Sequence, residues 1–519
     1  MKIPASIFLM LILVTGSVQI TSAAEFKLAA IFNDHAVLQR DAAVPVWGWA
    51  AAGAKVTVEF AGQTKTATAG ADGKWKVTLD SMPASSEPRE IKVSSNLKSE
   101  ILNLKFSDVL VGEVWLGSGQ SNMAMLVDMA ENAEKEKALA NLPMVRMYKE
   151  ASLAAGTAQP DSTGNWVVCA PDKVGSFSAT LYFFGREIHR KLGIPVGLIN
   201  ASMSGSAIEA WIPSETQYAS KELAPFFAAV EHPEPSGLSE EAKEKYNLAL
   251  ARWQTAAKKA KEEGKPAPRR PRDPAVVLAR QSGVGGFFNG KISPIIPYAI
   301  RGAVWYQGEG NVKPTHAPFY QYQLPMLVSD WRKHWGYEFP FAWVQLPNFR
   351  EKPDGDWVTI REAQLKTLAL PKTGMSVNID IGEENGLHPK NKQEVGRRLS
   401  LWALGDVYNQ KVAATSGPLP AGHEIRNDEI VLSFKHTNGG LVAKDGELKG
   451  FIIAGEDMQW KPAKARIEGD KVIVSSPDVK RPAAVRYAWE NFPTCNLFNG
   501  AGLPASPFRT DDWKLSGNK

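Results

Sequence analysis

The pattern of hydrophobic and polar residues divides the chain into strand-rich ends and a middle of alternating buried strands and helices. Within residues 25–107, the run Val56-Thr57-Val58-Glu59-Phe60 alternates apolar and polar side chains, which indicates a strand with one buried face. Asp72-Gly73 separates two further strand-like runs, 66–68 and 75–79, and predicts a hairpin between them. Short strands with a turn about every 8–12 residues predict an N-terminal β-sandwich.

From residue 108 to residue 416 the apolar runs are less interrupted. Five of them have the composition of strands buried on both faces: 109–116, 196–200, 302–305, 341–345 and 375–381. Between the first two, apolar residues recur at spacings of three and four from Phe177 to Leu192 and predict an amphipathic helix. Strands that alternate with helices predict an α/β domain with a mainly parallel sheet.

Residues 214–280 interrupt this alternation. A charged helix is expected over 238–263, and it merges into a Lys/Arg/Pro-rich run over 258–272. The run is either a patch for an acidic ligand or a solvated insertion, and the acidic residues within and beside it favour the insertion. Four short apolar runs then predict a second β-domain over 417–519: 430–432, 450–453, 472–474 and 485–487.

The N-terminus has the pattern of a secretory signal peptide. Lys2 precedes an apolar run over 7–14, and small residues follow over 21–24. The run is shorter than the roughly 20 residues of a spanning helix, so a retained anchor is the less favoured alternative. We therefore expect residues 1–24 to be removed and the protein to be periplasmic or secreted, without stable membrane insertion after cleavage.

Composition narrows the class further. The chain has 519 residues, of which 44% are hydrophobic and 22% charged, with a formal charge of +5, so it is neither disordered nor an obvious partner of nucleic acid. Its length predicts about three domains. Two cysteines, Cys169 and Cys495, form no disulfide framework or zinc site by themselves, although an oxidising destination would permit them to pair. No metal or other cofactor is expected, because no ligand cluster or phosphate loop has the required spacing.

Four polar blocks follow predicted strands and carry candidate chemistry. They are 117–123, 200–206, 304–311 and 387–392. Ser121 stands at a strand-to-helix turn, where its hydroxyl can attack a carbonyl carbon and its N–H can face the developing oxyanion. The N–H of Gly205 and the side-chain amide of Gln307 can donate to the same oxyanion. Each block alone is equally well an ordinary loop, and Gln307 alone a buried, satisfied side chain.

A serine nucleophile needs a base whose pKa lies near neutral, and histidine supplies one. Of the eight histidines, His388 is the best candidate because it follows a predicted buried strand after a short loop.

Together these blocks resemble the SGNH-type hydrolases, and most closely the sialate O-acetylesterase family. The resemblance is carried by Gly-Gln-Ser-Asn-Met at 119–123, Trp-Tyr-Gln-Gly-Glu at 305–309 and His-Pro-x-x-Lys at 388–392. It implies an α/β fold with an SGNH-hydrolase-like (flavodoxin-like) parallel sheet domain, flanked by N-terminal and C-terminal β-sandwich-like domains. It also implies hydrolysis of an acetyl ester on a sugar through an acetyl-enzyme. The implied roles are Ser121 as nucleophile, His388 as base, Ser121, Gly205 and Gln307 as oxyanion donors, and Gln120, Asn122 and Glu309 as supporting residues.

The chain departs from the family pattern just before the histidine. An acidic residue that holds the imidazole is often found two or three positions earlier, where this chain has Gly386 and Asn385. The loop offers Glu383, Glu384 and, further back, Asp380 instead. Three interpretations stand: Glu384 or the more distant Asp380 orients the ring, Asn385 or a backbone carbonyl accepts the Nδ1 proton in a Ser–His dyad, or the enzyme is impaired. The intact remaining blocks favour the dyad or Glu384.

Three functions follow from these interpretations. The first is removal of O-acetyl groups from sialic acid or a related acetylated sugar. The second is acetylxylan or other polysaccharide esterase activity, and the third is carbohydrate binding by a catalytically impaired protein. An enzyme selective for sialate needs a partner for the sugar carboxylate, and Arg350, Arg361 and Arg301 are the candidates.

Overall fold

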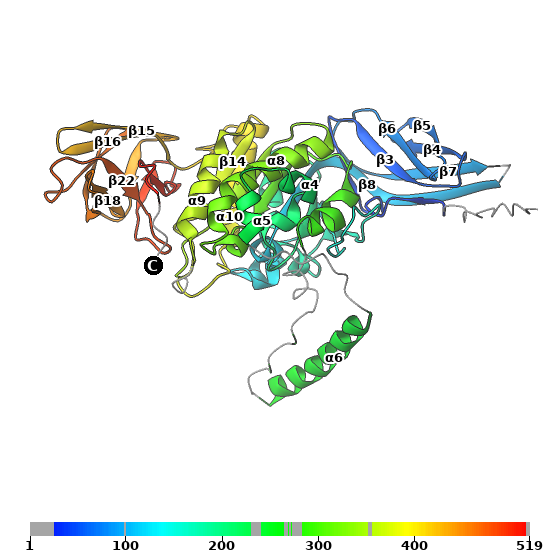
Figure 1. Cartoon of the computed structure of the whole chain (residues 1–519). Coiled ribbons are helices and arrows are strands. Elements are labelled where there is room, and N and C mark those ends of the chain that lie inside the picture. Colours follow the sequence, from blue (N-terminus) through cyan, green and yellow to red (C-terminus); the bar gives the residue numbers. More distant parts are fainter. Residues whose placement is uncertain are drawn as a thin grey trace, which may run out of the picture.

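The computed structural model describes most of the chain as three regions in a row (Figure 1). The described residues are 25–97, 100–229, 240–263, 268, 271, 283–350 and 355–514. The predicted signal peptide, residues 1–24, and much of the basic run over 258–272 lie outside them.

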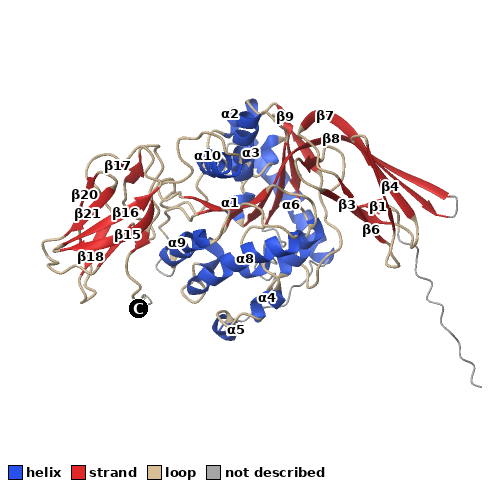
Figure 2. Cartoon of the chain, turned by 90° about the horizontal axis from the view of Figure 1, so that it is seen from above, coloured by secondary structure: helices blue, strands red, loops and turns tan. Residues whose placement is uncertain are grey.

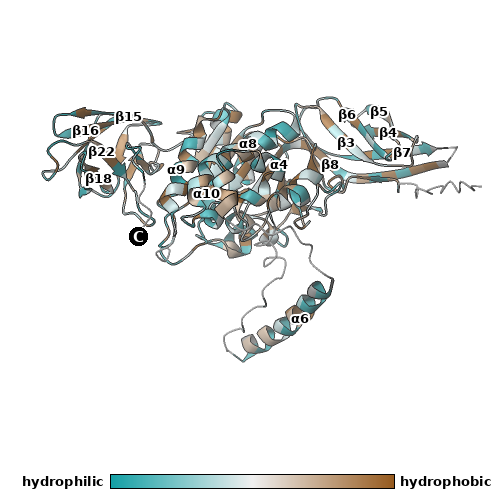
Figure 3. Ribbon diagram, in the orientation of Figure 1, coloured by the Kyte–Doolittle hydropathy of each residue, from teal (hydrophilic) through white to brown (hydrophobic). Residues whose placement is uncertain are grey.

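Two sheets form the N-terminal region. One is antiparallel and contains β1 (Lys27–Leu28), β3 (Val44–Trp49) and β6 (Lys74–Leu79); the other pairs β4 (Lys55–Phe60) with β5 (Gln63–Thr68) and β7 (Ser85–Leu97). Alternate residues of β4 and β6 are buried in one shared core. Figure 3 shows the corresponding change between hydrophobic and hydrophilic residues along these strands.

The hairpin predicted at Asp72-Gly73 is wrong. The turn forms, with Gly73 at φ 76° and a 2.9 Å hydrogen bond from the Gly70 N–H to the Lys74 carbonyl. However, β5 pairs with β4 and β6 pairs with β3, so the chain crosses from one sheet to the other at this turn. Alternating polarity identifies a strand and its buried face but does not identify its partner.

The long strand β8 (Glu100–Gly119) joins the N-terminal region to the central one. Its first part is antiparallel to β7 as far as Val111, and β2 (Val37–Gln39) runs parallel beside it. From Glu113 onward it is parallel to strands of the central sheet. The predicted boundary between residues 107 and 108 therefore falls inside a single strand, next to Asp108 at φ 56°.

The central region is a mixed sheet with helices on both faces. Its strand order is β10-β9-β11-β8-β12-β13-β14, and every neighbouring pair is parallel except β9 and β10. The bounds are β9 (Leu142–Lys149), β10 (Trp166–Cys169), β11 (Val196–Ser202), β12 (Gly302–Tyr306), β13 (Phe341–Val344) and β14 (Thr373–Ser376). The predicted α/β class is thus confirmed, although β14 ends at Ser376 rather than reaching residue 381.

Helices cover the two faces of this sheet (Figure 2). On one face α3 (Ala179–Leu192) packs against α10 (Lys392–Trp402), and on the other lie α8 (Tyr320–Trp335) and α9 (Trp357–Lys366). The predicted interruption contains α4 (Ser214–Tyr218), α5 (Ala224–Ala229) and α6 (Glu240–Glu262), and α6 stands apart from the rest in Figure 1. None of the described helices combines the length and apolarity needed to cross a membrane.

Short antiparallel strands make up the C-terminal region. One sheet has the order β15-β16-β21-β20, a second has β19-β18-β22-β24, and β17 pairs with β23. Their bounds are β15 (Leu419–Arg426), β16 (Glu429–Lys435), β17 (Leu441–Ala443), β18 (Phe451–Ala454), β19 (Lys461–Pro462), β20 (Lys464–Glu468), β21 (Lys471–Ser475), β22 (Ala484–Tyr487), β23 (Leu497–Asn499) and β24 (Phe508–Arg509). Cys169 and Cys495 are both free thiols in this structure.

A buried carboxylate links the N-terminal and central regions. Glu113 of β8 is fully buried and accepts hydrogen bonds from Arg40, from Gln39 at 3.3 Å, from Arg301 at 2.7 Å and from the Tyr408 hydroxyl at 3.0 Å. Burial alone would raise the pKa of Glu113, but the hydrogen bonds and charges of Arg301 and Arg40 outweigh it and hold the pKa below its ordinary value.

We expect Glu113→Gln to lower the free energy of unfolding by about 3 kcal/mol at pH 7, because it leaves two arginines without their shared counter-charge. Urea unfolding measures the change, and Glu59→Gln on an exposed position of β4 is the matched control. Since the pKa is lowered on folding, the ionised form stabilises the protein above the ordinary value of 4.5. The difference from wild type should therefore shrink as the pH falls below 4.5. A constant difference down to acid pH would contradict this assignment.

Candidate active site

The structure brings the predicted nucleophile and base together at the carboxyl end of β8. Ser121 is the first residue of the short helix α1 (Ser121–Ala124), and its Oγ lies 2.7 Å from Nε2 of His388, which is 267 positions away in the sequence. Gly119 makes the turn possible, because it adopts φ 126° and a side chain there would collide with the carbonyl of Tyr306. This separation lets the imidazole accept the hydroxyl proton directly.

Asn122 fixes the two segments relative to each other. Its side chain is fully buried; Nδ2 donates to the Glu309 carboxylate and, at 3.1 Å, to the carbonyl of Leu387, while Oδ1 accepts from Nζ of Lys392 at 2.6 Å. A lysine only donates and a carboxylate only accepts, so the amide has one satisfied orientation. Asn122 therefore ties the serine turn, the β12 loop and the residue before His388 into one network, which contains two of the three predicted supporting residues, Asn122 and Glu309.

Lys392 is a site residue that sequence reasoning did not single out. It is fully buried, and its Nζ lies 5.1 Å from the centre of the Tyr306 ring. Burial lowers the pKa of Lys392 from 10.5 to about 7, although the charges of Glu309 and Glu383 oppose the shift. Its place in the His-Pro-x-x-Lys block was the available signal, but a lysine at the start of a charged helix is typical of a solvated position.

The charge of Lys392 acts on the histidine. Partial burial lowers the pKa of His388 below its ordinary value, and the nearby Lys392 charge lowers it further. The ring keeps one side open to solvent, so a substrate can reach it. Neutral imidazole, the form that accepts a proton, therefore predominates near neutral pH.

None of the expected acids orients His388 in the structure. Glu384 pairs with Arg350 at 2.8 Å, and Asp380 binds Arg398 through both oxygens at 2.7 and 2.8 Å. Within the described residues, no carboxylate bonds to His388, and the exposed Asn385 side chain makes no hydrogen bond. The geometry is that of a Ser–His pair, and it does not place Glu384 or Asp380 as the third member.

Gln307 is not placed to donate to an oxyanion. Its fully buried Nε2 donates to Asn311 at 2.7 Å and to the Ser206 carbonyl at 3.3 Å, and its Oε1 accepts from the Tyr320 hydroxyl at 2.9 Å. Both amide hydrogens are thus in use, which corrects the expected donor role. The residue is instead the satisfied buried glutamine that was the alternative interpretation.

Other donors remain beside Ser121. The N–H groups of Ser121 and Gly205 make no hydrogen bond within the described part of the chain. Gln120 is only 3% exposed, and its Oε1 accepts a 2.9 Å hydrogen bond from the Gly310 N–H. Its Nε2 has no hydrogen-bond partner among the described residues. Because the oxygen is held, the amide hydrogens of Gln120 have a defined direction.

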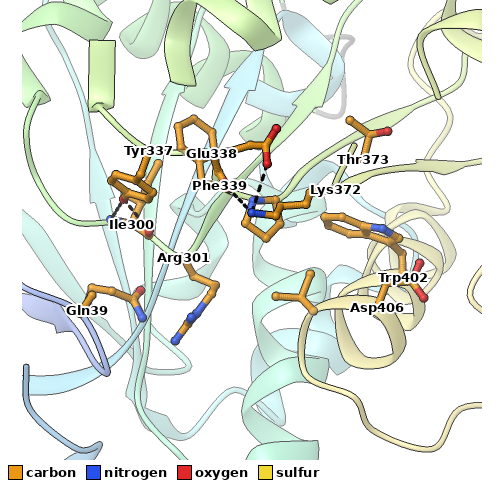
Figure 4. Close-up of a pocket in the computed structure, with 13 residues that line it drawn as sticks. Gln39, Ile300, Arg301, Tyr337, Glu338, Phe339, Lys372, Thr373, Trp402 and Asp406 are labelled. Atoms are coloured by element: carbon orange, nitrogen blue, oxygen red, sulfur yellow. Dashed lines mark hydrogen bonds and ion pairs between the residues drawn. The ribbon is translucent and has the colours of Figure 1, made fainter. Parts of the chain in front are cut away.

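A cavity of about 660 Å³ opens at the opposite edge of the sheet, at the amino ends of β12, β13 and β14 (Figure 4). Tyr337, Lys372 and Trp402 line it, and Lys372 pairs with Glu338 at 3.2 Å. No predicted catalytic residue lines this cavity, so it is separate from the Ser121–His388 site. Across the described residues no group of three metal-ligating side chains occurs.

Comparisons with known proteins agree with this picture. A family model described as carbohydrate esterase, sialic acid-specific acetylesterase, matches residues 111–238 and 290–403. The sialate O-acetylesterase of Rattus norvegicus is 29% identical over 554 residues, covering 97% of this chain and 98% of the relative. That of Homo sapiens is 27% identical over 528 residues, covering 93% and 92%. The crystal structure of a carbohydrate acetylesterase from Xanthomonas citri has a TM-score of 0.79 and 34% identity, covering 94% of this chain and 100% of that one.

We expect Lys392→Met to move the acid limb of the kcat/KM profile to higher pH, because removing the positive charge raises the pKa of His388. The rate also falls, since Asn122 loses the donor that orients its amide. The measurement is kcat/KM against pH with a soluble acetyl ester, and Lys411→Met, an exposed lysine outside the site, is the control. An acid limb that stays in place or moves to lower pH would refute the electrostatic role.

Proposed function

Because the chain belongs to the sialic acid-specific acetylesterase family of carbohydrate esterases, we propose that it removes O-acetyl groups from sialic acid or a related sugar through a serine acyl-enzyme. The supporting observation is the 2.7 Å contact between Ser121 Oγ and His388 Nε2. The enzyme class, a carbohydrate acetylesterase, follows from family membership. The substrate and the mechanism are our proposal.

In the proposed first step, Ser121 Oγ attacks the acetyl carbonyl carbon as His388 takes the hydroxyl proton. The tetrahedral intermediate then collapses: the bond to the sugar oxygen breaks, and that oxygen leaves with the proton from His388. The acetyl group remains on Ser121. In the second step water attacks the acetyl carbon and gives one proton to His388. Ser121 Oγ then leaves with that proton, and acetic acid is released and ionises in solution.

The oxyanion of each tetrahedral intermediate needs donors that are free before the reaction. We assign this role to the backbone N–H groups of Ser121 and Gly205, which have no partner within the described residues. The side-chain amide of Gln120 takes the place first assigned to Gln307, because its Nε2 is unpartnered in the same residues and its Oε1 is already held by Gly310.

We expect Ser121→Ala and His388→Ala each to remove nearly all activity, and Glu384→Gln to cost less because its carboxylate pairs with Arg350 rather than with the ring. Initial rates with a generic acetyl ester measure all three. A Glu384→Gln loss as large as that of His388→Ala would overturn the dyad. Absence of turnover by the wild-type protein would favour carbohydrate binding alone.

Only one of the three predicted arginines is available to bind a substrate carboxylate near His388. Arg361 is fully buried and donates to the carbonyls of Leu346, Pro347, Glu490 and Asn491, and Arg301 is bound to Glu113. Arg350 has a side chain that is 64% exposed, pairs with Glu384 and lies 5.5 Å from the ring of Phe492. Glu384 belongs to the histidine loop, so this guanidinium borders the proposed site.

We propose that a sialate carboxylate replaces that of Glu384 on Arg350. The sialate O-acetylesterase names of the full-length relatives support this choice. A neutral polysaccharide such as acetylated xylan is the alternative, and the more general name of the Xanthomonas citri structure is compatible with it.

We expect Arg350→Gln to lower kcat/KM for an O-acetylated sialic acid by roughly 10–100-fold, the worth of one charged hydrogen bond, and to leave the rate on acetylated xylan unchanged. Deacetylation rates of wild type and variant on both substrates provide the test. If the wild-type rates on the O-acetylated sialic acid and on acetylated xylan are equal and very low, the result argues against both substrates. An equal loss on both with the variant would remove Arg350 from carboxylate recognition.

A further inference from the structure

The loop that carries His388 is closed by a carboxylate that the mechanism does not use. Oε1 of Glu383 accepts a 2.8 Å hydrogen bond from the backbone N–H of Lys390. Glu383 and Lys390 lie on either side of His388 in the sequence, so this bond spans the histidine. It holds the chain two residues after the ring in place.

Glu383 also fills the space beside Gly386, where a side chain would otherwise stand. A Cβ added at Gly386 would overlap Oε2 of Glu383 and lie 2.9 Å from its Cβ. The backbones of these two residues also pair, with the Gly386 N–H 3.3 Å from the Glu383 carbonyl. Gly386 has no positive φ, so the local backbone accepts other residues and only the Glu383 side chain excludes them. A side chain at 386 and the carboxylate of Glu383 in this position are therefore mutually exclusive.

We propose that Glu383 is a positioning residue that takes over from the acid absent at 385 and 386, and that it aims His388 through the loop backbone rather than through the ring. This inference rests on the proposed function. On one side of the histidine, Asn122 holds the Leu387 carbonyl; on the other, Glu383 holds the Lys390 N–H. Because the chain is held on both sides of His388, Nε2 of the ring faces Ser121 although no described residue bonds to Nδ1.

The two kinds of support differ in what they supply. A carboxylate on Nδ1 orients the ring and also stabilises the imidazolium that forms during the reaction. A brace on the backbone orients the ring only. The acceptor oxygen of Glu383, rather than its charge, is therefore the property that counts, and a glutamine retains that oxygen.

The test compares Glu383→Gln, Glu383→Ala, Gly386→Ala and the double variant Glu383→Gly/Gly386→Asp, each made as residues 25–519. We expect Glu383→Ala to lower kcat roughly 100-fold with KM within about threefold, since a small misplacement of a catalytic group has that effect. Glu383→Gln should stay within about threefold of wild type. Glycine at 383 also removes the Cβ that lies 2.9 Å from an added Cβ at 386, so Asp at 386 then has room and should restore about tenfold of the loss. Gly386→Ala alone should lower kcat, because its Cβ collides with the carboxylate of Glu383 and it supplies no acid.

The outcomes separate the possible failures. If the wild type turns over and Glu383→Ala is equally active, the positioning role is wrong. It is also wrong if Glu383→Gln is as defective as Glu383→Ala. If the wild type does not turn over, the proposed function itself is wrong. Glu456→Ala, on an exposed position of the C-terminal region, is the matched control and should match wild type. Thermal unfolding checks each variant, and if Glu383→Ala does not fold, Glu383→Gln and Gly386→Ala decide: a defective Glu383→Gln variant or a fully active Gly386→Ala variant refutes the brace.

Discussion

The position of Ser121, the proposed nucleophile, depends on one strand that belongs to two sheets at once. β8 leaves the N-terminal sheet, passes the Glu113 cluster and becomes the centre of the parallel sheet, with β11 and β12 on its two sides. Ser121 follows its carboxyl end, where Gly119 lies against the backbone of Tyr306. Side chains alternate between the two faces of a strand. A register shift of one residue in β8 would therefore move each of its side chains to the opposite face of the sheet. The N-terminal region is therefore part of the framework that determines the position of Ser121.

Contacts among backbone and uncharged groups carry much of the site's organisation. Asn122 connects the serine turn with Glu309, Lys392 and the carbonyl next to His388, and its own amide orientation is determined by those partners. The usual acid on the imidazole is replaced by neighbours that hold the chain on either side of the ring. Burial of His388 and the charge of the enclosed Lys392 both lower the pKa of the histidine and so favour its neutral form. The site is thus preorganised, while the imidazolium of the proposed mechanism would have no carboxylate beside it within the described residues.

Much of this arrangement could be predicted from the sequence, and the failures have identifiable causes. Buried strands and the helix over 179–192 follow from local periodicity, and Ser121 and His388 follow from their place after strands, which the topology brings to one edge. Partner choice does not follow from periodicity, so the hairpin at Asp72-Gly73 failed. The roles of Gln307 and Lys392 depend on which groups surround them after folding: the glutamine has used both amide hydrogens, and the lysine is enclosed. No local pattern contains that information.

Arg361 has a consequence for how such a protein can change over generations. Its guanidinium is fully enclosed and shares its hydrogen bonds between carbonyls of the central region and those of Glu490 and Asn491 in the C-terminal region. A gene rearrangement that carried the central region alone into another protein would leave the buried guanidinium of Arg361 without half of its hydrogen-bond acceptors. Together with β8, which the N-terminal and central regions share, this makes each region depend on buried contacts with its neighbour.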